Sequence, residues 1–330
     1  MKKILIYDIA AAFGGAKKVL DEFYEEYRAR EDYECYFITS FLDYPTNQRI
    51  HVIKLPWTKK SWIHRLYCDY FYMPGLIKRL EIEEVLSLQN MGIPHCTVKQ
   101  TVYVHNAIPF TEHRFSAIKE PFLWTYQNVI GRLIYSSLRK ADSVIVQTLW
   151  MKEEVIKRCQ ISGDKILVQR VYVKEQNSGL REVSSVPTFF YPATPFRFKN
   201  FEVVLEACKD LKRLGIKKYE IVMTFTGKEN RLAKAITKKV RKYNLPIKLV
   251  GRLNLEQMEL LYKKSILLFP SYLETIGLPL LEAKAFQAPI VAADCKYAHD
   301  ALKGYENVWY FPYEDQEALK TVMLLFLENA

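Results

Sequence analysis

Short apolar runs and longer amphipathic segments alternate along the whole chain. The apolar runs are rich in β-branched and aromatic side chains, which is typical of strands buried in a parallel sheet. Strands that alternate with helical patterns predict an α/β protein with parallel sheets. The predicted strands cover residues 3–7, 34–38, 52–55, 85–88, 101–104, 143–147, 166–171, 188–191, 220–226, 247–250, 266–269, 290–293 and 308–311. The clearest predicted helices cover residues 16–28, 201–214, 231–243, 255–264 and 316–328.

One segment interrupts this alternation. Residues 174–187 are polar, turn-rich and weakly patterned, which indicates a linker. The chain has 330 residues, a length that suits two domains. We therefore expect domains at 1–173 and 188–330, each doubly wound, with ligands bound at the carboxyl ends of the strands and in a cleft between the domains.

Composition narrows the cellular setting. The six cysteines are scattered singly, without the pair spacings of metal or redox sites, which favours a reducing compartment. The first apolar run is far shorter than the core of a signal peptide, and no apolar run approaches the length of a membrane span. These features predict a cytoplasmic protein.

The chain is strongly basic, with 48 Lys and Arg against 37 Asp and Glu. A basic surface suits nucleic acid, an anionic membrane or anionic small substrates. The sequence shows no zinc spacing, RNA-binding signature or long basic arm, so nucleic acid is the least favoured partner. Phosphates of nucleotide substrates or of lipids are the simpler expectation.

The stretch 271–283 carries the most specific chemistry. It follows a buried strand, and Gly277 and Pro279 predict a turn that leads into a helix. The start of a helix offers backbone N–H groups and the positive end of its dipole to a phosphate. Glu274 in the loop and Glu282 in the helix flank that position, and carboxylates accept hydrogen bonds from sugar hydroxyls.

This stretch resembles the signature of the family-4 (group 1) retaining glycosyltransferases. The resemblance implies the GT-B fold, with two doubly wound Rossmann-like domains and a deep interdomain cleft. It implies an acceptor-binding first domain, a donor-binding second domain, and no cofactor or metal, in keeping with the absence of an Asp-x-Asp sequence. The matching residues are Pro270, Ser271, Glu274, Gly277, Leu278, Pro279, Glu282 and Ala283.

The resemblance also implies roles for single residues. Lys199 would stabilise the charge that grows on the leaving phosphate, Glu274 would contact the donor sugar, and Glu282 would hold the ribose. His105 would position the donor sugar or the acceptor, and with Lys199 and Glu274 it completes the expected catalytic set. The expected donor-binding residues are Gly14, Gly15, Arg197, Lys199, Gly227, Lys228, Gly251, Arg252, Glu274, Thr275, Ile276, Gly277, Leu278 and Glu282.

Two segments of the first domain mix aromatic and basic residues, at 57–79 and 110–124. Such a mixture suits the interface of an anionic membrane. Burial of the aromatic side chains in a core is the simpler interpretation, and the sequence leaves both open. Docking on the inner face of the plasma membrane would suit a lipid-linked acceptor.

The sequence thus predicts a retaining glycosyltransferase that moves a sugar from a UDP- or GDP-sugar to a glycan or lipid-linked saccharide, in cell-surface polysaccharide biosynthesis. The phosphate of the donor itself would take the proton of the acceptor. Two alternatives stay open. One is a nucleotide-sugar epimerase of the same fold, and the other is a non-catalytic subunit that binds nucleotide sugar.

Overall fold

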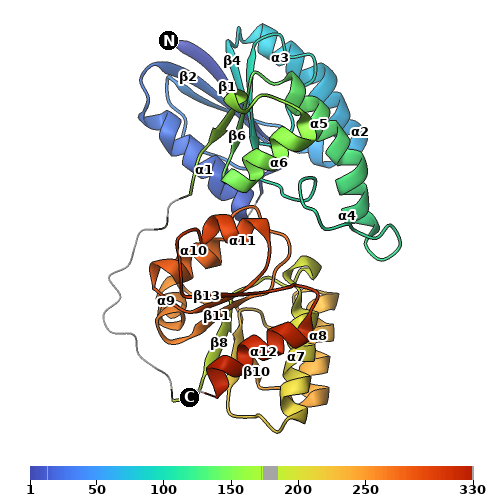
Figure 1. Cartoon of the computed structure of the whole chain (residues 1–330). Helices are drawn as coiled ribbons and strands as arrows, with labels where there is room; N and C mark the ends of the chain where they lie inside the picture. The colour runs from blue at the N-terminus through green and yellow to red at the C-terminus, as the bar shows by residue number, and fades with distance from the viewer. Residues whose placement is uncertain (13, 172, 174–184, 329–330) are drawn as a thin grey trace. The chain divides into compact units, whose positions relative to one another are not determined.

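The computed structural model describes residues 1–12, 14–171, 173 and 185–328. The chain divides into two compact units, Met1–Arg170 and Val171–Ala330, which Figure 1 colours from blue to green and from yellow to red. Most of the predicted linker, residues 174–184, lies outside the described residues. Within the described residues, every helix is too short or too polar to span a lipid bilayer.

Unit 1 is built on a seven-stranded parallel sheet with the order β3-β2-β1-β4-β5-β6-β7. The chain first winds outward from β1 to β3 and then restarts at β4 beside β1, so the winding direction reverses between these two strands. The strands are β1 (Lys2–Asp8), β2 (Tyr33–Thr39), β3 (Ile50–Lys54), β4 (Glu84–Ser87), β5 (Lys99–Val104), β6 (Ser143–Val146) and β7 (Ile166–Val168). The helices are α1 (Gly14–Ala29), α2 (Trp62–Tyr67), α3 (Met73–Arg79), α4 (Pro121–Thr125), α5 (Gly131–Lys140) and α6 (Leu149–Cys159).

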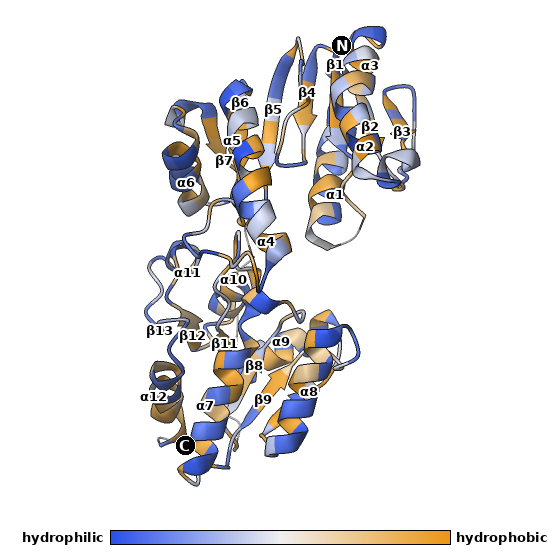
Figure 2. Ribbon diagram, turned by 90° about the vertical axis from the view of Figure 1, so that its right-hand side faces the viewer, coloured by the Kyte–Doolittle hydropathy of each residue, from blue (hydrophilic) through white to orange (hydrophobic). Residues whose placement is uncertain are grey.

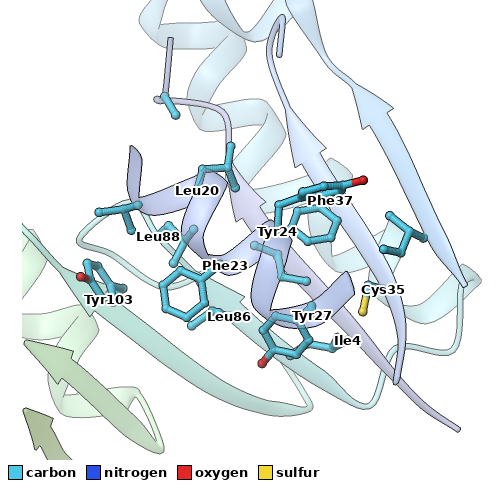
Figure 3. Packing of buried hydrophobic residues seen from close by; sticks show 14 of the residues in the cluster. Ile4, Leu20, Phe23, Tyr24, Tyr27, Cys35, Phe37, Leu86, Leu88 and Tyr103 are labelled. Carbon is cyan, nitrogen blue, oxygen red and sulfur yellow. The ribbon is translucent and has the colours of Figure 1, made fainter. Parts of the chain in front are cut away.

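Strand β1 is buried on both faces, which explains why it reads as a continuous apolar run. Ile4 and Ile6 pack with Phe23 of α1 in one core cluster, part of which Figure 3 shows. Leu5 and Tyr7 point to the opposite face and pack in a second cluster with side chains of α3. Because successive side chains of a strand point to opposite faces, β1 contributes to the core on both sides of the sheet.

Two wide helical turns were not predicted. The π-turn Cys68–Tyr72 joins α2 to α3, and the π-turn Tyr126–Ile130 joins α4 to α5. The first ends two residues before Pro74, which has no N–H for an ordinary helical bond, and the N–H of Met73 donates to the carbonyl of Cys68. Such turns frequently occur at functional sites.

Unit 2 is built on a six-stranded parallel sheet with the order β10-β9-β8-β11-β12-β13. Here the winding direction reverses between β8 and β11. The strands are β8 (Thr188–Tyr191), β9 (Glu220–Met223), β10 (Ile247–Leu249), β11 (Ile266–Phe269), β12 (Ile290–Ala293) and β13 (Val308–Phe311). The helices are α7 (Phe201–Arg213), α8 (Arg231–Tyr243), α9 (Leu255–Lys264), α10 (Leu278–Ala285), α11 (Lys296–Ala301) and α12 (Gln316–Leu327).

Helices α7 and α8 carry both hydrophobic and hydrophilic residues, orange and blue in Figure 2, and their buried positions are apolar. Each predicted strand is present, and four of those in unit 2 have the predicted bounds. Strand β9 is shorter than predicted and ends at Met223. Its neighbour β10 pairs only with Ile221–Met223, so residues 224–226 have no strand partner on that side and form a loop.

Candidate active site

The candidate site of unit 2 lies where the winding direction of its sheet reverses. Strands β8 and β11 are neighbours, with Leu267 opposite Phe190, so the loops that follow them leave the same edge of the sheet. Ligands of doubly wound sheets bind at this position. The loop after β8 carries Lys199 at the end of a 3-10 turn, and the loop after β11 carries Glu274.

Lys199 and Glu274, two of the predicted catalytic residues, form an ion pair between Nζ and Oε1. The exposed fractions of their side chains are 14% and 16%, so the pair is largely removed from water. The hydroxyl of Ser271 donates to the same Oε1 of Glu274 at 2.7 Å, and the Lys199 ammonium lies 5.5 Å from the ring centroid of Phe269. Without a ligand, each charge therefore neutralises the other.

The loop after β11 is held from several sides. The backbone N–H of Tyr272 donates to the carbonyl of Phe198 at 3.0 Å, and the Tyr297 hydroxyl donates to the carbonyl of Ser271. Gly277 has φ +74°, and a Cβ added there would lie 3.1 Å from the Tyr297 ring, so this turn requires glycine. Tyr297 is buried, and the sequence analysis assigned it no role.

The start of α10 differs in one respect from the prediction. Pro279 has no N–H, and the N–H of Leu280 donates to the carbonyl of Gly277 at 2.8 Å. Neither Pro279 nor Leu280 therefore has a backbone donor available to a ligand at this helix start. Of the predicted residues before Pro279, the side chains of Thr275, Ile276 and Leu278 are half-buried.

Glu282 is oriented by a tyrosine that the sequence analysis missed. The hydroxyl of Tyr262, on α9, donates to Glu282 Oε2 at 2.5 Å. Burial and the neighbouring carboxylate raise the pKa of Tyr262 well above its ordinary range, so the hydroxyl keeps its proton and stays a donor. Nothing in the pattern of α9 distinguishes this tyrosine from an ordinary core residue.

The two predicted glycine loops lie after β9 and β10. Gly227 and Gly251 have φ values of +88° and +77°, and a Cβ added to Gly227 would lie 2.1 Å from Thr237 Oγ1. Their neighbours Lys228 and Arg252 are exposed. Packing alone therefore requires glycine at position 227, whatever its role in ligand binding.

A carboxylate of the chain already occupies the first of these loops. Glu229 accepts from the N–H of Thr226 at 2.6 Å and from the N–H of Gly227 at 2.9 Å. Desolvation opposes the charged form of Glu229, but these bonds outweigh it and lower its pKa. An anion that bound these amides would have to displace Glu229. Arg197, which we expected beside the donor phosphate, is exposed.

In unit 1, His105 directly follows β5. The side-chain oxygen of Asn90 accepts from the N–H groups of His105 and Asn106 at 2.8 and 2.9 Å, and Asn90 itself has φ +64°. Burial lowers the pKa of His105 to about 4. At neutral pH its imidazole is therefore uncharged and suits hydrogen bonding to a hydroxyl rather than binding of an anion.

Asp8, at the end of β1, is a candidate that the sequence analysis missed. Its exposed fraction is 0%, and Oδ1 accepts from the N–H groups of Ala10 and Ala11 at 3.1 and 2.9 Å. Its Oδ2 has no hydrogen-bond partner among the described residues, and burial raises its pKa to about 6. A buried carboxyl at the reversal point between β1 and β4 is a signal for function.

The predicted glycines Gly14 and Gly15 open α1. A Cβ added to Gly15 would meet nothing within 4 Å, so packing within unit 1 does not require glycine there. Among the described residues, no group of three or more His, Cys, Asp or Glu side chains is placed to hold a metal ion.

The family whose description is "Glycosyl transferases group 1" matches residues 174–330. A search of curated proteins gave no match. Solved structures align over almost the whole chain. A sucrose-phosphate synthase from Thermosynechococcus elongatus has 16% identity, covers 100% of this chain and 90% of its own, and gives a TM-score of 0.72.

Two further structures give similar values. WaaG, a glycosyltransferase involved in lipopolysaccharide biosynthesis, has 16% identity, coverage of 99% and 90%, and a TM-score of 0.69. HepE from Anabaena, in complex with UDP and glucose, has 12% identity, coverage of 100% and 90%, and a TM-score of 0.67. At such identities the likeness shows the fold. The chain therefore has the GT-B fold, and its residues 174–330 match the model of the group 1 glycosyltransferases.

Proposed function

We propose that the protein is a retaining, metal-independent glycosyltransferase that moves a sugar from a nucleotide-sugar donor to a glycan or a lipid-linked saccharide. The observation that carries this proposal is the Lys199–Glu274 pair at the reversal point of unit 2. It brings together a cation and a carboxylate that lie 75 residues apart in the sequence. The family match of the same half of the chain supports a donor site there.

In this proposal unit 2 binds the donor. When the donor binds, the Lys199 ammonium would leave Glu274 and pair with the diphosphate. In that position it would stabilise the negative charge of the leaving group. Glu274 would then be released to accept hydrogen bonds from sugar hydroxyls. Glu282, already oriented by Tyr262, would accept hydrogen bonds from the two hydroxyls of the ribose.

Unit 1 would bind the acceptor. The uncharged His105 would accept a hydrogen bond from a hydroxyl or donate one to it. The acceptor oxygen would form its bond to the anomeric carbon on the face from which the phosphate leaves. The proton of the acceptor hydroxyl would pass to an oxygen of that phosphate. No protein nucleophile takes part, and the configuration of the sugar is retained.

The test is release of nucleoside diphosphate, measured with purified protein, a panel of UDP- and GDP-sugars and saccharide acceptors. We expect release that depends on the acceptor and survives a chelator, and an NMR spectrum of the product that shows retained configuration. Release without an acceptor, an inverted product, or loss of activity with the chelator would contradict the proposal.

Single substitutions test the roles of the residues. Lys199→Ala should lower kcat by a factor of about 100 or more, as loss of one donor to a developing charge does. Glu282→Ala should chiefly weaken donor binding, measured by calorimetry. Lys234→Ala, at an exposed position on α8, is the matched control and should leave both quantities unchanged. Near-normal turnover of the Lys199 variant would remove this residue from the site.

A further inference from the structure

Unit 1 exposes many large apolar side chains in two segments. Burial in a core, the simpler interpretation of these segments, holds for Phe110 and Phe115, but it is wrong for many of their other aromatic residues. The exposed fractions of Trp62, Phe71 and Phe122 are 71%, 70% and 69%. We call the following exposed residues the α2–α5 face: Trp62, Ile63, Leu66, Tyr67, Tyr70, Phe71, Ile118, Phe122, Trp124, Val129 and Leu133.

The two segments border one cavity. Its volume is about 380 Å³, and its lining includes Leu66 and Tyr70 from the first segment and Leu133 and Lys140 from the helix of the second. The first π-turn, Cys68–Tyr72, contributes to this lining together with α2 and α5, which Figure 1 labels in unit 1. Leu66 and Tyr70 of the first segment therefore border the same hollow as Leu133 of α5.

The cavity lining combines polar and charged side chains with apolar ones. Arg65 lies in it, held by Asp69 at 2.9 Å and by the side-chain oxygen of Gln89. Gln89 is more than nine-tenths buried, and its Nε2 has no hydrogen-bond partner among the described residues. An unpartnered buried amide donor beside a guanidinium and the Lys140 ammonium suits an anionic group such as a phosphate.

Charge on this surface has one dominant sign. Between residues 56 and 80 the only acidic residue is Asp69, which Arg65 neutralises. Between residues 110 and 140, which cover the second segment and extend to the end of α5, the acidic residues are Glu112 and Glu120. The basic residues between 57 and 79 and between 110 and 140 are Lys59, Lys60, Arg65, Lys78, Arg79, Arg114, Lys119, Arg132, Arg139 and Lys140.

We propose that unit 1 docks on the surface of an anionic lipid bilayer through the α2–α5 face. The aromatic and aliphatic side chains enter the interface, the lysines and arginines contact head-group phosphates, and the cavity receives one such phosphate. Tryptophan and tyrosine mixed with basic residues suit a membrane interface. The core of a protein–protein interface is instead depleted in lysine. The inference concerns unit 1 alone and does not depend on the transfer reaction.

The experiment is co-sedimentation of the whole chain with vesicles of phosphatidylcholine, alone or mixed with phosphatidylglycerol. We expect binding to the mixed vesicles that weakens with salt, and little binding to phosphatidylcholine alone. Lys60 and Lys119 are exposed, one in each segment. The variant K60E/K119E should bind at least roughly 25-fold more weakly, about fivefold for each basic residue lost.

Matched controls lie in unit 2. K234E/K238E makes the same charge change at exposed positions of the basic helix α8 and should bind like the parent. Ile63→Ser with Phe71→Ser should weaken binding about tenfold or more through lost apolar burial. Leu214→Ser with Leu255→Ser, at positions 61% and 76% exposed, should not.

Tryptophan emission gives a second readout. Of the five tryptophans, Trp62 and Trp124 are the two with exposed side chains, at 71% and 38%. Mixed vesicles should shift the emission to shorter wavelength, and W62F/W124F should abolish the shift. Absence of binding to mixed vesicles would overturn the proposal. Equal losses of vesicle binding in a unit 1 variant and its matched unit 2 control would also overturn it. So would self-association of the chain that I63S/F71S abolishes.

Discussion

Asp8 is deeply buried, and its Oδ2 has no hydrogen-bond partner among the described residues. Burial opposes its ionised form and thereby raises its pKa. Because the pKa of the folded state lies near 6, above the ordinary value of 3.8, the folded protein binds this proton more readily than the unfolded chain does. The resulting stability is present below about pH 4 and is lost as the pH rises through 6. At neutral pH, Asp8 is therefore a net cost to stability.

We predict that Asp8→Asn raises the free energy of unfolding at about pH 7.5 by roughly 1–3 kcal/mol. The Asn oxygen can still accept from Ala10 and Ala11, while the buried charge is removed. The gain should disappear near pH 4, where Asp8 is protonated, and urea unfolding at both pH values measures it. His105 titrates in parent and variant alike and cancels. A gain of equal size at both pH values would contradict the assignment to titration.

The Lys199–Glu274 pair predicts strong coupling between two substitutions. Lys199→Met leaves a largely buried carboxylate without its cation, which should cost about 1–3 kcal/mol of stability. Adding Glu274→Gln removes the stranded charge and should restore at least about 1 kcal/mol, since the two residues are in contact. Chemical unfolding of the parent, both single variants and the double variant measures this coupling. Additive effects would show that the two charges do not interact in solution.

At the scale of elements, the strands were predictable because each is a buried apolar run of a parallel sheet. The length of strand β9 was overestimated because the last predicted residues lack a strand partner. Whether they have one depends on the length of β10. The π-turns were not predictable, because the sequence shows Pro74 but not how the preceding helix adapts to it. In each unit, candidate residues depend on partners distant in sequence, such as Tyr262 for Glu282 in unit 2 and Asn90 for His105 in unit 1. No local pattern identifies such pairs.

Two glycines of unit 2 allow the stability cost of backbone strain to be distinguished from the cost of a steric overlap. Both Gly227 and Gly215 have positive φ, +88° and +81°, but a Cβ at Gly215 would meet nothing within 4 Å. Gly215→Ala should therefore cost only the left-handed conformation, about 1–2 kcal/mol. Gly227→Ala should cost about 1–3 kcal/mol more, because its Cβ would overlap Thr237 Oγ1. Thermal unfolding measures both costs, and Thr237→Ala should recover part of the second. Equal costs for the two glycine variants would contradict this explanation.

At the scale of the whole molecule, the chain has two compact units, so we predict two unfolding transitions. A nucleotide sugar that binds unit 2 should raise the temperature of one transition and leave the other unchanged. At a ligand concentration of 100 times Kd the stabilisation is about 2.7 kcal/mol, or roughly 5–11 °C for a unit of this size. Differential scanning calorimetry with a panel of nucleotide sugars measures the shift and identifies the donor. A shift of both transitions by the same amount would contradict binding to one unit.

The strand order of unit 2 also has a consequence for synthesis on the ribosome. Strand β8 emerges first, but its neighbour β11 ends at Phe269, so the centre of the sheet stays open until some eighty further residues have been translated. Until then, the apolar edge of β8 toward β11 is an unpaired strand edge, which is prone to misassociation. Because Lys199 and Glu274 follow these two strands, the ion pair between them forms only once that edge is closed. Formation of this ion pair therefore reports that the centre of the sheet has closed.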